Sequence, residues 1–374
     1  MRELGKISFL FIAVISISCG SGSTPGSTNP PPPGPSPGPG SVSSVSSVST
    51  CPADFYPGMT CSQATVSCAN TDNIKVIYGY KTPAGALKGT IFLHAGSGGT
   101  TAFTYGPLSG QTYVESYFKS GYRVVELEWA SDWETATSAG PENIKSAACR
   151  PATLLNYVYE NIHGGSAGQG GMCAHGNSAG SAAMAYALTW YKSDAFLDKV
   201  VLTSGPVLGD IEAGCQVPNV PPITVCASGQ FGCVGGPWSD APQYQQGSNA
   251  PQKWTGDKTC NNVPAGQSTS TASNAAWKSQ SIVDGTANAN FSYPKTALSG
   301  WLCSNGSNPS AAQGQYYFQN ILSPSQTAAF SLYRVDSCIE AEDVWNGTTS
   351  SGQSAFDASV NDMIDPVAGC LKRH

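Results

Sequence analysis

The sequence predicts an α/β protein with a mostly parallel, doubly wound sheet, and three observations support this. From about residue 73 onward, short apolar segments of strand length alternate with segments whose apolar residues recur at helical spacing. Such alternation requires crossover connections, which place successive strands side by side in parallel with helices on both faces. The chain has 374 residues and 40% of them are hydrophobic, which is enough for one large core.

Strands are predicted where apolar runs are short and bounded by turn residues. They lie at residues 73–80, 90–94, 123–129, 171–174, 199–203, 296–301 and 331–335. Helices are predicted at residues 151–162, 179–191, 313–322 and 355–371. The first of these is expected to begin at Pro151, because the fixed φ of proline suits the first turn of a helix.

Between residues 212 and 291 this alternation stops, and Pro, Gly, Ser and Asn predominate. A loop of this length without regular structure is improbable in a compact domain unless disulfides crosslink it or it has a function. The segment contains Cys215, Cys226, Cys233, Cys260, Trp238, Trp254 and Trp277. We therefore predict a domain spanning residues 51–374 with a disulfide-stapled cap insertion at about 212–291, whose tryptophans either form a local core or contact a ligand.

The charge composition argues against nucleic acid as a partner. There are 18 basic and 24 acidic side chains, which give a net charge of −6 and a pI of about 5.2. A nucleic-acid-binding surface needs a cluster of Lys and Arg to neutralise phosphates.

The N-terminus has the features of an export signal. Arg2 and Lys6 precede an apolar run over residues 7–17, which is too short to span a bilayer stably. Residues 16–20 (SISCG) resemble a bacterial lipobox, in which Cys19 would be acylated and would anchor the chain to a membrane by lipid alone. Residues 1–18 are thus predicted to be a signal peptide; the alternative is ordinary cleavage nearby and free secretion.

Residues 19–50 are rich in Pro, Gly and Ser and have almost no apolar bulk. Such a segment cannot bury a core, so we predict an extended, flexible tether between the anchor and the folded domain.

The cysteines point to disulfides. The chain has 13 Cys, and removing Cys19 leaves 12, all within residues 51–374. In an exported chain these are disulfides by default, so up to six bridges are possible. Cys303 and Cys338 each follow a predicted strand and are a candidate pair. No zinc spacing, phosphate-binding loop or dinucleotide fingerprint is found, so no cofactor or metal is expected.

Residues 176–180 read Gly-Asn-Ser-Ala-Gly and match G-x-S-x-G between a predicted strand and a small-residue helix. Glycines on either side leave room for a sharp turn that projects Ser178, while the following helix start directs N–H groups at developing negative charge. The alternative is a small-residue turn selected for packing alone.

With this motif and the loop over residues 94–99 (HAGSGG), the chain resembles the α/β-hydrolase superfamily over about residues 70–371. The resemblance implies that Ser178 is a nucleophile. It also implies an oxyanion hole formed by the N–H of Ala179 and that of Ala95 or Gly96.

The remaining triad residues are not found where the resemblance implies them, namely an acid after the penultimate strand and a His after the last. Asn305 lies in the first loop, which has no carboxylate, and Asp343 stands about where the His is expected. Asp210, one strand earlier, is a possible alternative acid. None of the four histidines is a convincing base. His94, His163, His175 and His374 each fit a structural position better.

Two functions remain open. The first is a serine hydrolase of the carboxylesterase type, acting through an acyl-enzyme on a small-molecule or polymer-borne ester. The second is a catalytically degenerate relative that binds a glycan or an apolar ligand without turnover. The turn at residues 176–180, which we call the elbow, favours the serine hydrolase, and the missing His favours the ligand-binding relative. The oligomeric state is not predicted.

Overall fold

The structure is a computed structural model that describes residues 39–105, 110–135, 144–215, 222–240, 277–285, 288–304, 309–338 and 344–374. The chain divides into two units, Met1–Gly34 and Pro35–His374, and all the described residues lie in the second. The predicted signal peptide and Cys19 lie outside the described residues.

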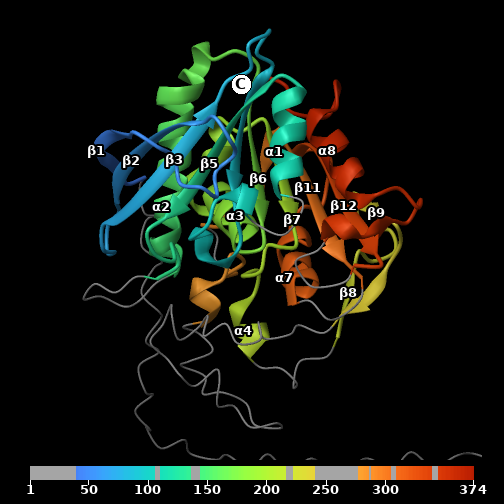
Figure 1. Cartoon of the computed structure of the whole chain (residues 1–374). Coiled ribbons are helices and arrows are strands. Elements are labelled where there is room, and N and C mark those ends of the chain that lie inside the picture. Colours follow the sequence, from blue (N-terminus) through green and yellow to red (C-terminus); the bar gives the residue numbers. More distant parts are fainter. Residues whose placement is uncertain are drawn as a thin grey trace, which may run out of the picture. The chain divides into compact units, whose positions relative to one another are not determined.

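A large mixed sheet forms the centre of this unit (Figure 1). Its strands are β1 (Ser41–Val48), β2 (Thr60–Ser67), β3 (Ile74–Lys81), β4 (Gly89–His94), β5 (Tyr122–Trp129), β6 (Gly171–Asn177), β7 (Lys199–Thr203), β9 (Cys233–Val234), β11 (Tyr293–Cys303), β12 (Thr327–Asp336) and β13 (Thr348–Thr349). Their order is β1-β2-β3-β5-β4-β6-β7-β11-β12-β13, with β9 also paired to β12. A separate hairpin pairs β8 (Ile223–Val225) with β10 (Trp238–Asp240).

The middle of the sheet is parallel, as predicted. The six neighbouring strands β5, β4, β6, β7, β11 and β12 pair in parallel, while β1, β2, β3 and β13 pair antiparallel at the two edges. Every residue of β4, β6 and β7 is buried, as expected for parallel strands that are covered on both faces.

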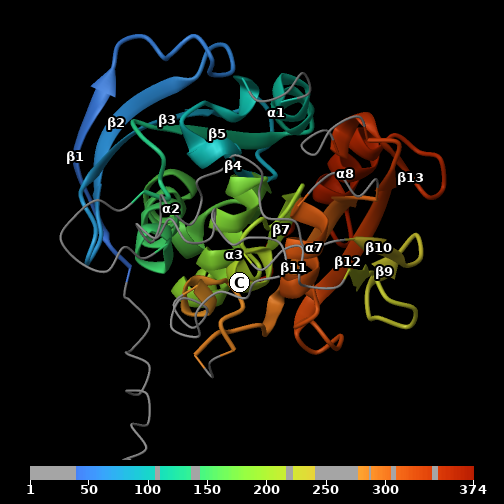
Figure 2. The ribbon, with the colours of Figure 1, turned by 90° about the horizontal axis from the view of Figure 1, so that it is seen from below.

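Helices cover both faces of the sheet (Figure 2). On one face lie α2 (Ile144–Val158), α3 (Ala179–Tyr191) and α7 (Pro309–Phe318), and on the other lie α1 (Gly110–Lys119) and α8 (Ala355–Ile364). The short helix α4 is Ile211–Cys215. Single turns occur at η1 (Ser97–Gly99), η2 (Phe103–Tyr105), η3 (Tyr159–His163), η4 (Gly165–Ala167), η5 (Ser193–Ala195) and η7 (Val344–Asn346).

The predicted tether extends too far, because its end is a strand. Ser41–Val48 pair with β2 as the edge strand β1, with a register shift between Ser43 and Ser46. Val42 and Val48 pack against the core, and backbone hydrogen bonds supply the remaining contacts. An edge strand needs few apolar residues, so its composition resembled that of a linker.

Two predicted helix limits were also wrong. Pro151 lies inside α2, which already begins at Ile144. Ile144, Ala147 and Ala148 are fully buried, and this packing outweighs the hydrogen bond that proline cannot make. The last helix ends at Ile364 rather than 371, because Pro366 follows and disfavours helix at the residue before it.

The predicted cap is described only in part. Residues 222–240 hold the β8–β10 hairpin and β9, which extends the main sheet beside β12. Residues 277–285 pack on α3, where Tyr186 donates to the Gln280 carbonyl and Trp190 to that of Ile282. Trp238 and Trp277 are buried, consistent with a local core.

Disulfides join distant parts of the described chain. The pairs are Cys51–Cys61, Cys68–Cys149, Cys173–Cys370, Cys226–Cys233 and Cys303–Cys338. The last pair confirms the predicted bridge between the loops after β11 and β12. Cys260 and the side chain of Cys215 lie outside the described part of the structure.

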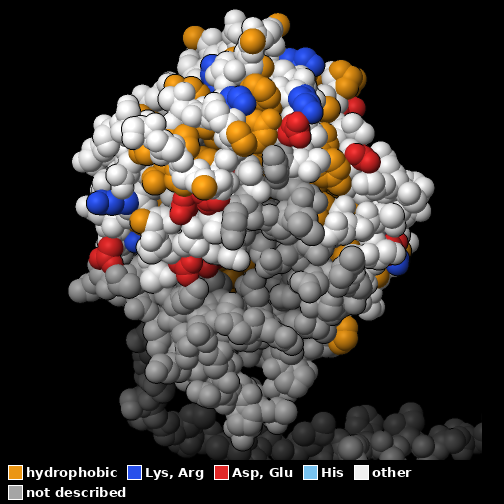
Figure 3. Space-filling model, viewed as in Figure 1, with side chains coloured by type: hydrophobic (Ala, Val, Ile, Leu, Met, Phe, Trp, Pro, Cys, Tyr) orange, Lys and Arg blue, Asp and Glu red, His pale blue; other side chains and the backbone are white. Residues whose placement is uncertain are grey.

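Charged side chains are sparse on the face shown in Figure 3, where the few Lys and Arg are scattered rather than gathered into a patch. Within the described ranges, no helix has the length and apolarity needed to cross a bilayer.

Candidate active site

Ser178 occupies the turn between the central strand β6 and helix α3, as the sequence predicts. Its backbone has φ 52° and ψ −115°, and the residue is 4% exposed. Non-glycine residues rarely adopt a positive φ, and such strain is maintained only where the surrounding structure enforces it. Here the Ser178 N–H donates to the Thr203 carbonyl of β7 at 2.9 Å, and the Ser178 carbonyl accepts from the N–H of Ala182 at 3.1 Å.

The two glycines of the motif are required by close backbone contacts. A methyl group added at Gly176 would lie 2.3 Å from the Gly180 carbonyl oxygen, and one added at Gly180 would lie 2.0 Å from the His94 carbonyl oxygen. These are backbone atoms, which cannot rotate away. The spacing G-x-S-x-G therefore reflects the packing of the turn against β4.

We expect Gly180→Ala to lower the free energy of unfolding by about 3 kcal/mol or more, since the overlap can be relieved only by moving backbone. Urea unfolding followed by circular dichroism measures the change. Gly85→Ala is the matched control, because an added methyl there meets no heavy atom within 4 Å. Its stability should stay within about 1 kcal/mol of wild type, and equal losses in both variants would contradict the packing argument.

The loop after β4 lies directly against Ser178. A Cβ at Gly96 would lie 3.0 Å from the Ser178 Cβ, so a side chain at this position would crowd Ser178. The N–H of Gly99 donates to the Gly96 carbonyl at 2.8 Å, which closes the turn η1. Ala179 begins α3, where the first N–H groups have no partner within the helix. The structure thus brings together Ser178, Gly96 and the start of α3.

His94 holds this loop through its ring. Its Nε2 accepts a hydrogen bond from the Trp129 indole at 3.1 Å, so its Nδ1 carries the proton and donates to the Ala95 carbonyl at 2.9 Å. Burial lowers the pKa of His94 to about 4, although the Ala95 carbonyl opposes this. The ring is therefore neutral, and its two hydrogen bonds fix the loop after β4 against Trp129. This agrees with the structural role predicted for His94.

His175 lies in a buried chain of hydrogen bonds that leads back to the elbow. Its two ring nitrogens bond to Tyr117 Oη at 3.0 Å and to Thr203 Oγ1 at 3.1 Å. Thr203 in turn donates to Oδ1 of Asn177, the residue before Ser178, at 3.0 Å. Both ring nitrogens are used, so His175 supports the turn rather than accepting a proton from the nucleophile.

The other two histidines also have partners of their own. The His163 ring bonds to Thr90 Oγ1 at 3.1 Å, and the His374 ring bonds to the Leu197 carbonyl at 3.2 Å. The described residues therefore show each of the four rings in a structural contact.

Asp210, predicted as a possible acid, stands at the start of α4. One carboxylate oxygen accepts from the N–H of Ala213 at 3.1 Å, and the other forms an ion pair with Lys278. Its backbone exchanges hydrogen bonds of 2.8 and 2.9 Å with the Gln313 amide. The carboxylate is held by structural partners, and its role as the triad acid stays a prediction.

Asn305 and Asp343 lie outside the described residues, but the ends of their loops are visible. Cys303 and Cys338 tie the two loops together, and Ser304 Oγ donates to the Asp336 carboxylate. The disulfide thus joins the described ends of β11 and β12, from which the two loops start.

Sequence reasoning overlooked Asp336, the carboxylate at the end of β12. Burial alone would raise its pKa, but hydrogen bonds from Ser304 and Arg334 hold the pKa below its ordinary value. The sequence signal that could have identified Asp336 is its position directly after the apolar pattern of a predicted strand.

Within the described ranges, no group of three or more His, Cys, Asp or Glu side chains could hold a metal ion.

The buried rings predict a pH-dependent stability. Burial lowers the pKa of His94 to about 4 and that of His175 to about 3, both below the unfolded value of about 6.5. The rings thus contribute stability that is complete above pH 6.5 and is lost as the pH falls through about 4 and 3, by about 3 kcal/mol or more each. Burial raises the pKa of Glu126 to about 7, which acts in the opposite sense, whereas burial lowers the pKa of His163 to about 4 and acts in the same sense as the two rings.

Urea unfolding at pH 7, 6, 5 and 4 tests this expectation. The free energy of unfolding should fall over this range in the wild type and fall less steeply in His175→Gln, whose amide does not titrate. Parallel curves for the two proteins would show that His175 is not the titrating group.

The position of the elbow within the sheet decides the fold. Ser178 follows β6, the strand at the centre of the parallel segment, with the oxyanion-type loop on the neighbouring strand β4. The chain has the α/β-hydrolase fold. No protein-family model and no curated protein sequence matches it.

Solved structures with this α/β-hydrolase fold resemble the chain. A bacterial heroin esterase is 12% identical with a TM-score of 0.49 over 86% of this chain and 87% of that one. Carboxyl esterase 2 of the mycorrhizal fungus Tuber melanosporum is 16% identical with a TM-score of 0.47 over 91% and 93%. Brefeldin A esterase, a bacterial homologue of human hormone sensitive lipase, is 13% identical with a TM-score of 0.47 over 86% and 80%. At these identities the likeness concerns the fold alone.

Proposed function

We propose that the protein is a serine hydrolase of the carboxylesterase type. The observation that carries the proposal is the strained backbone of Ser178 at the carboxyl end of β6, with Gly96 packed against its Cβ. Strained conformations of this kind cluster at active sites. The neighbouring N–H groups of a helix start and of a glycine loop are the donors that a tetrahedral oxyanion requires.

In the proposed reaction, Ser178 Oγ loses its proton to a base and attacks the ester carbonyl carbon. The N–H of Ala179 and that of Ala95 or Gly96 hold the resulting oxyanion. The alcohol leaves with a proton, and water then hydrolyses the acyl-enzyme to release the acid and regenerate the hydroxyl. In this proposal the loops carrying Asn305 and Asp343 occupy the acid and base positions.

The substrate class follows as part of the same proposal. It is a small-molecule or polymer-borne ester met outside the cytoplasm. The five disulfides of the described residues support export, because such bonds persist in oxidising compartments. After removal of the leader, an acylated Cys19 would then hold the protein at a membrane through its lipid.

A second candidate is ligand binding without turnover. One observation favours it: all four histidine rings have structural partners. A hydrolase of this fold would then need a base other than histidine.

Covalent labelling tests the proposed function. The oxidised full chain is treated with a fluorophosphonate probe, and the adduct is mapped by mass spectrometry while p-nitrophenyl acetate and butyrate are assayed in parallel. Labelling of Ser178 together with ester release is the expected result. An unlabelled Ser178 and background hydrolysis would reject the serine hydrolase and leave the binding function.

A further inference from the structure

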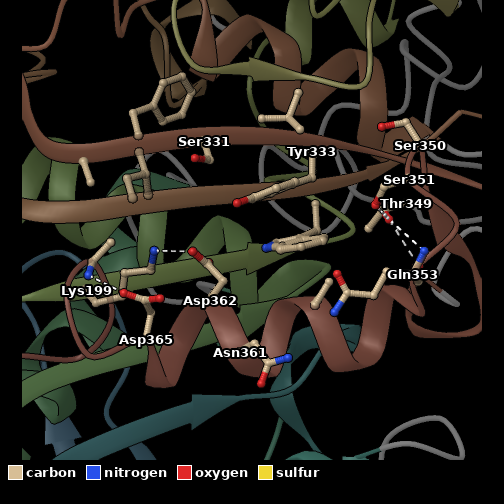
Figure 4. A pocket seen from close by; sticks show the side chains of 17 residues that line it. Lys199, Ser331, Tyr333, Thr349, Ser350, Ser351, Gln353, Asn361, Asp362 and Asp365 are labelled. Atoms are coloured by element: carbon tan, nitrogen blue, oxygen red, sulfur yellow. Dashed lines mark hydrogen bonds and ion pairs between the residues drawn. The ribbon is translucent and has the colours of Figure 1, made fainter.

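A groove lies away from Ser178, between helix α8, the strands β11 and β12, and the β13 turn (Figure 4). Its volume is about 380 Å³, within the range of about 300–1,000 Å³ that is usual for small-molecule sites. None of the elbow and oxyanion residues described above lines it. The groove is therefore separate from the turn that holds Ser178.

Two stacked aromatic rings form part of its wall. Trp301 of β11 and Tyr333 of β12 are directly paired in the parallel register, and their ring centroids are 3.9 Å apart at an interplanar angle of 13°. Trp301 is 1% exposed, whereas Tyr333 is half-buried. The tryptophan thus supports the tyrosine ring, which is the aromatic surface available to a ligand.

One polar group in this wall lacks a partner. The indole N–H of Trp301 is buried and has no hydrogen-bond acceptor among the described residues. Because this N–H is inaccessible to solvent, it does not donate to a ligand, and Trp301 contributes to the groove by supporting the Tyr333 ring.

The rim is rich in neutral polar groups. The amides of Asn361 and Gln353 are exposed, and Figure 4 shows Gln353 beside Thr349 and Ser351, with Asn361 apart from them on helix α8. Amides and hydroxyls both donate and accept, so they suit a ligand that carries several hydroxyl groups.

The single basic side chain among the described lining residues of the groove is already paired. Lys199 is its one basic lining residue and is 2% exposed; its Nζ lies 2.8 Å from the Asp362 carboxylate, which also accepts from Ser299. Asp365 accepts two backbone N–H groups at 2.7 Å. Among the described lining residues one Lys faces two Asp, so the groove offers no free positive charge to a phosphate or carboxylate and disfavours an anionic ligand.

We propose that this groove binds a short saccharide. A pyranose ring has an apolar C–H face that matches the Tyr333 ring, and it has a rim of hydroxyls that matches the exposed amides of Asn361 and Gln353. A purely apolar ligand would leave these polar groups unsatisfied, and an anion would find no free positive charge.

The register places one end of the groove near the carboxyl edge of the sheet. Thr349 pairs with Val335 at the end of β12, and Trp301 pairs with Thr203 at the end of β7. Ser178 follows β6, the neighbour of β7, at the same edge. A saccharide in the groove would thus extend toward the edge that carries the proposed nucleophile, without being part of its site.

Isothermal titration calorimetry tests the proposal on the full chain carrying Ser178→Ala, so that the result does not depend on ester turnover. The probes are cellotetraose, xylotetraose, mannotetraose and chitotetraose, with inorganic phosphate as the anionic comparison. At least one saccharide should bind with a dissociation constant of 1 mM or tighter, on the order of 4 kcal/mol or more, and phosphate should not bind.

Variants locate the binding. Tyr333→Ala should weaken it by about tenfold or more, and Asn361→Ala, an exposed change that does not threaten folding, by about threefold. Tyr80→Ala is the matched control, since Tyr80 is also half-buried but lies on β3 near the other edge of the sheet. The absence of binding to all four saccharides, or affinities unchanged by both groove variants, would overturn the proposal.

Discussion

Replacing Ser178 with alanine is expected to lower kcat for p-nitrophenyl acetate by roughly a thousandfold or more. The change removes the Oγ that is proposed to form the acyl-enzyme but leaves the turn, because the backbone hydrogen bonds of Ser178 to Thr203 and Ala182 do not use the side chain. The proposed N–H donors also remain, so KM should change far less than kcat. Steady-state kinetics on both proteins give the two constants separately.

Ser166→Ala is the matched control for this substitution. Ser166 is exposed in the short turn η4, and its loss should leave turnover within twofold of wild type. If Ser178→Ala kept most of the wild-type rate while remaining folded, the hydrolysis would have to come from another site.

Replacing Asp343 with histidine is expected to raise ester turnover by about a hundredfold, which is the lower end of what a positioned general base contributes. A carboxylate with an ordinary pKa of about 4 is a poor base for a hydroxyl, whereas an imidazole titrates near neutral pH. Adding Asn305→Asp should raise the rate further, since a carboxylate can orient the ring. The measurement is kcat/KM for p-nitrophenyl butyrate between pH 6 and 9.

The neighbouring substitution Glu342→His tests whether a gain in turnover requires the ring at residue 343 or only a histidine somewhere in the loop. It adds the same ring one residue away, so it should give no comparable gain. Unchanged rates in Asp343→His, alone and with Asn305→Asp, would show that the loops after β11 and β12 do not lie where the chain order suggests.

Much of the fold was predictable because its central strands are buried on both faces. Segments such as β4, β7 and helix α3 are continuous runs of apolar or small residues, and their limits coincide with the predicted ones within a residue. The sheet edge was not predictable, because β1 and β2 rely on backbone pairing and leave only alternate side chains to pack. Their polar composition therefore resembles that of a linker or loop.

The candidate site also has one part that the sequence predicts and another that it does not. The elbow was readable because its glycines are imposed by contacts as close as 2.0 Å, which no other residue can satisfy. The supporting role of His175 depends on Tyr117 and Thr203, which are far away in the sequence and meet only in the folded chain. The groove beside α8 is likewise formed by elements that are distant in the sequence, namely α8, the strands β11 and β12, and the β13 turn. No local sequence pattern predicts it.

The edge strand β1 also determines how the domain would respond to mechanical load. Tension along the N-terminal segment would act first at Ser41, the start of β1. It would break the backbone pairing of β1 with β2 progressively from that end. Detachment would stop at Cys51, because its disulfide to Cys61 fastens the chain to β2. The ten residues released would span at most roughly 35 Å, so tension would detach this edge strand before it loaded the strands around Ser178.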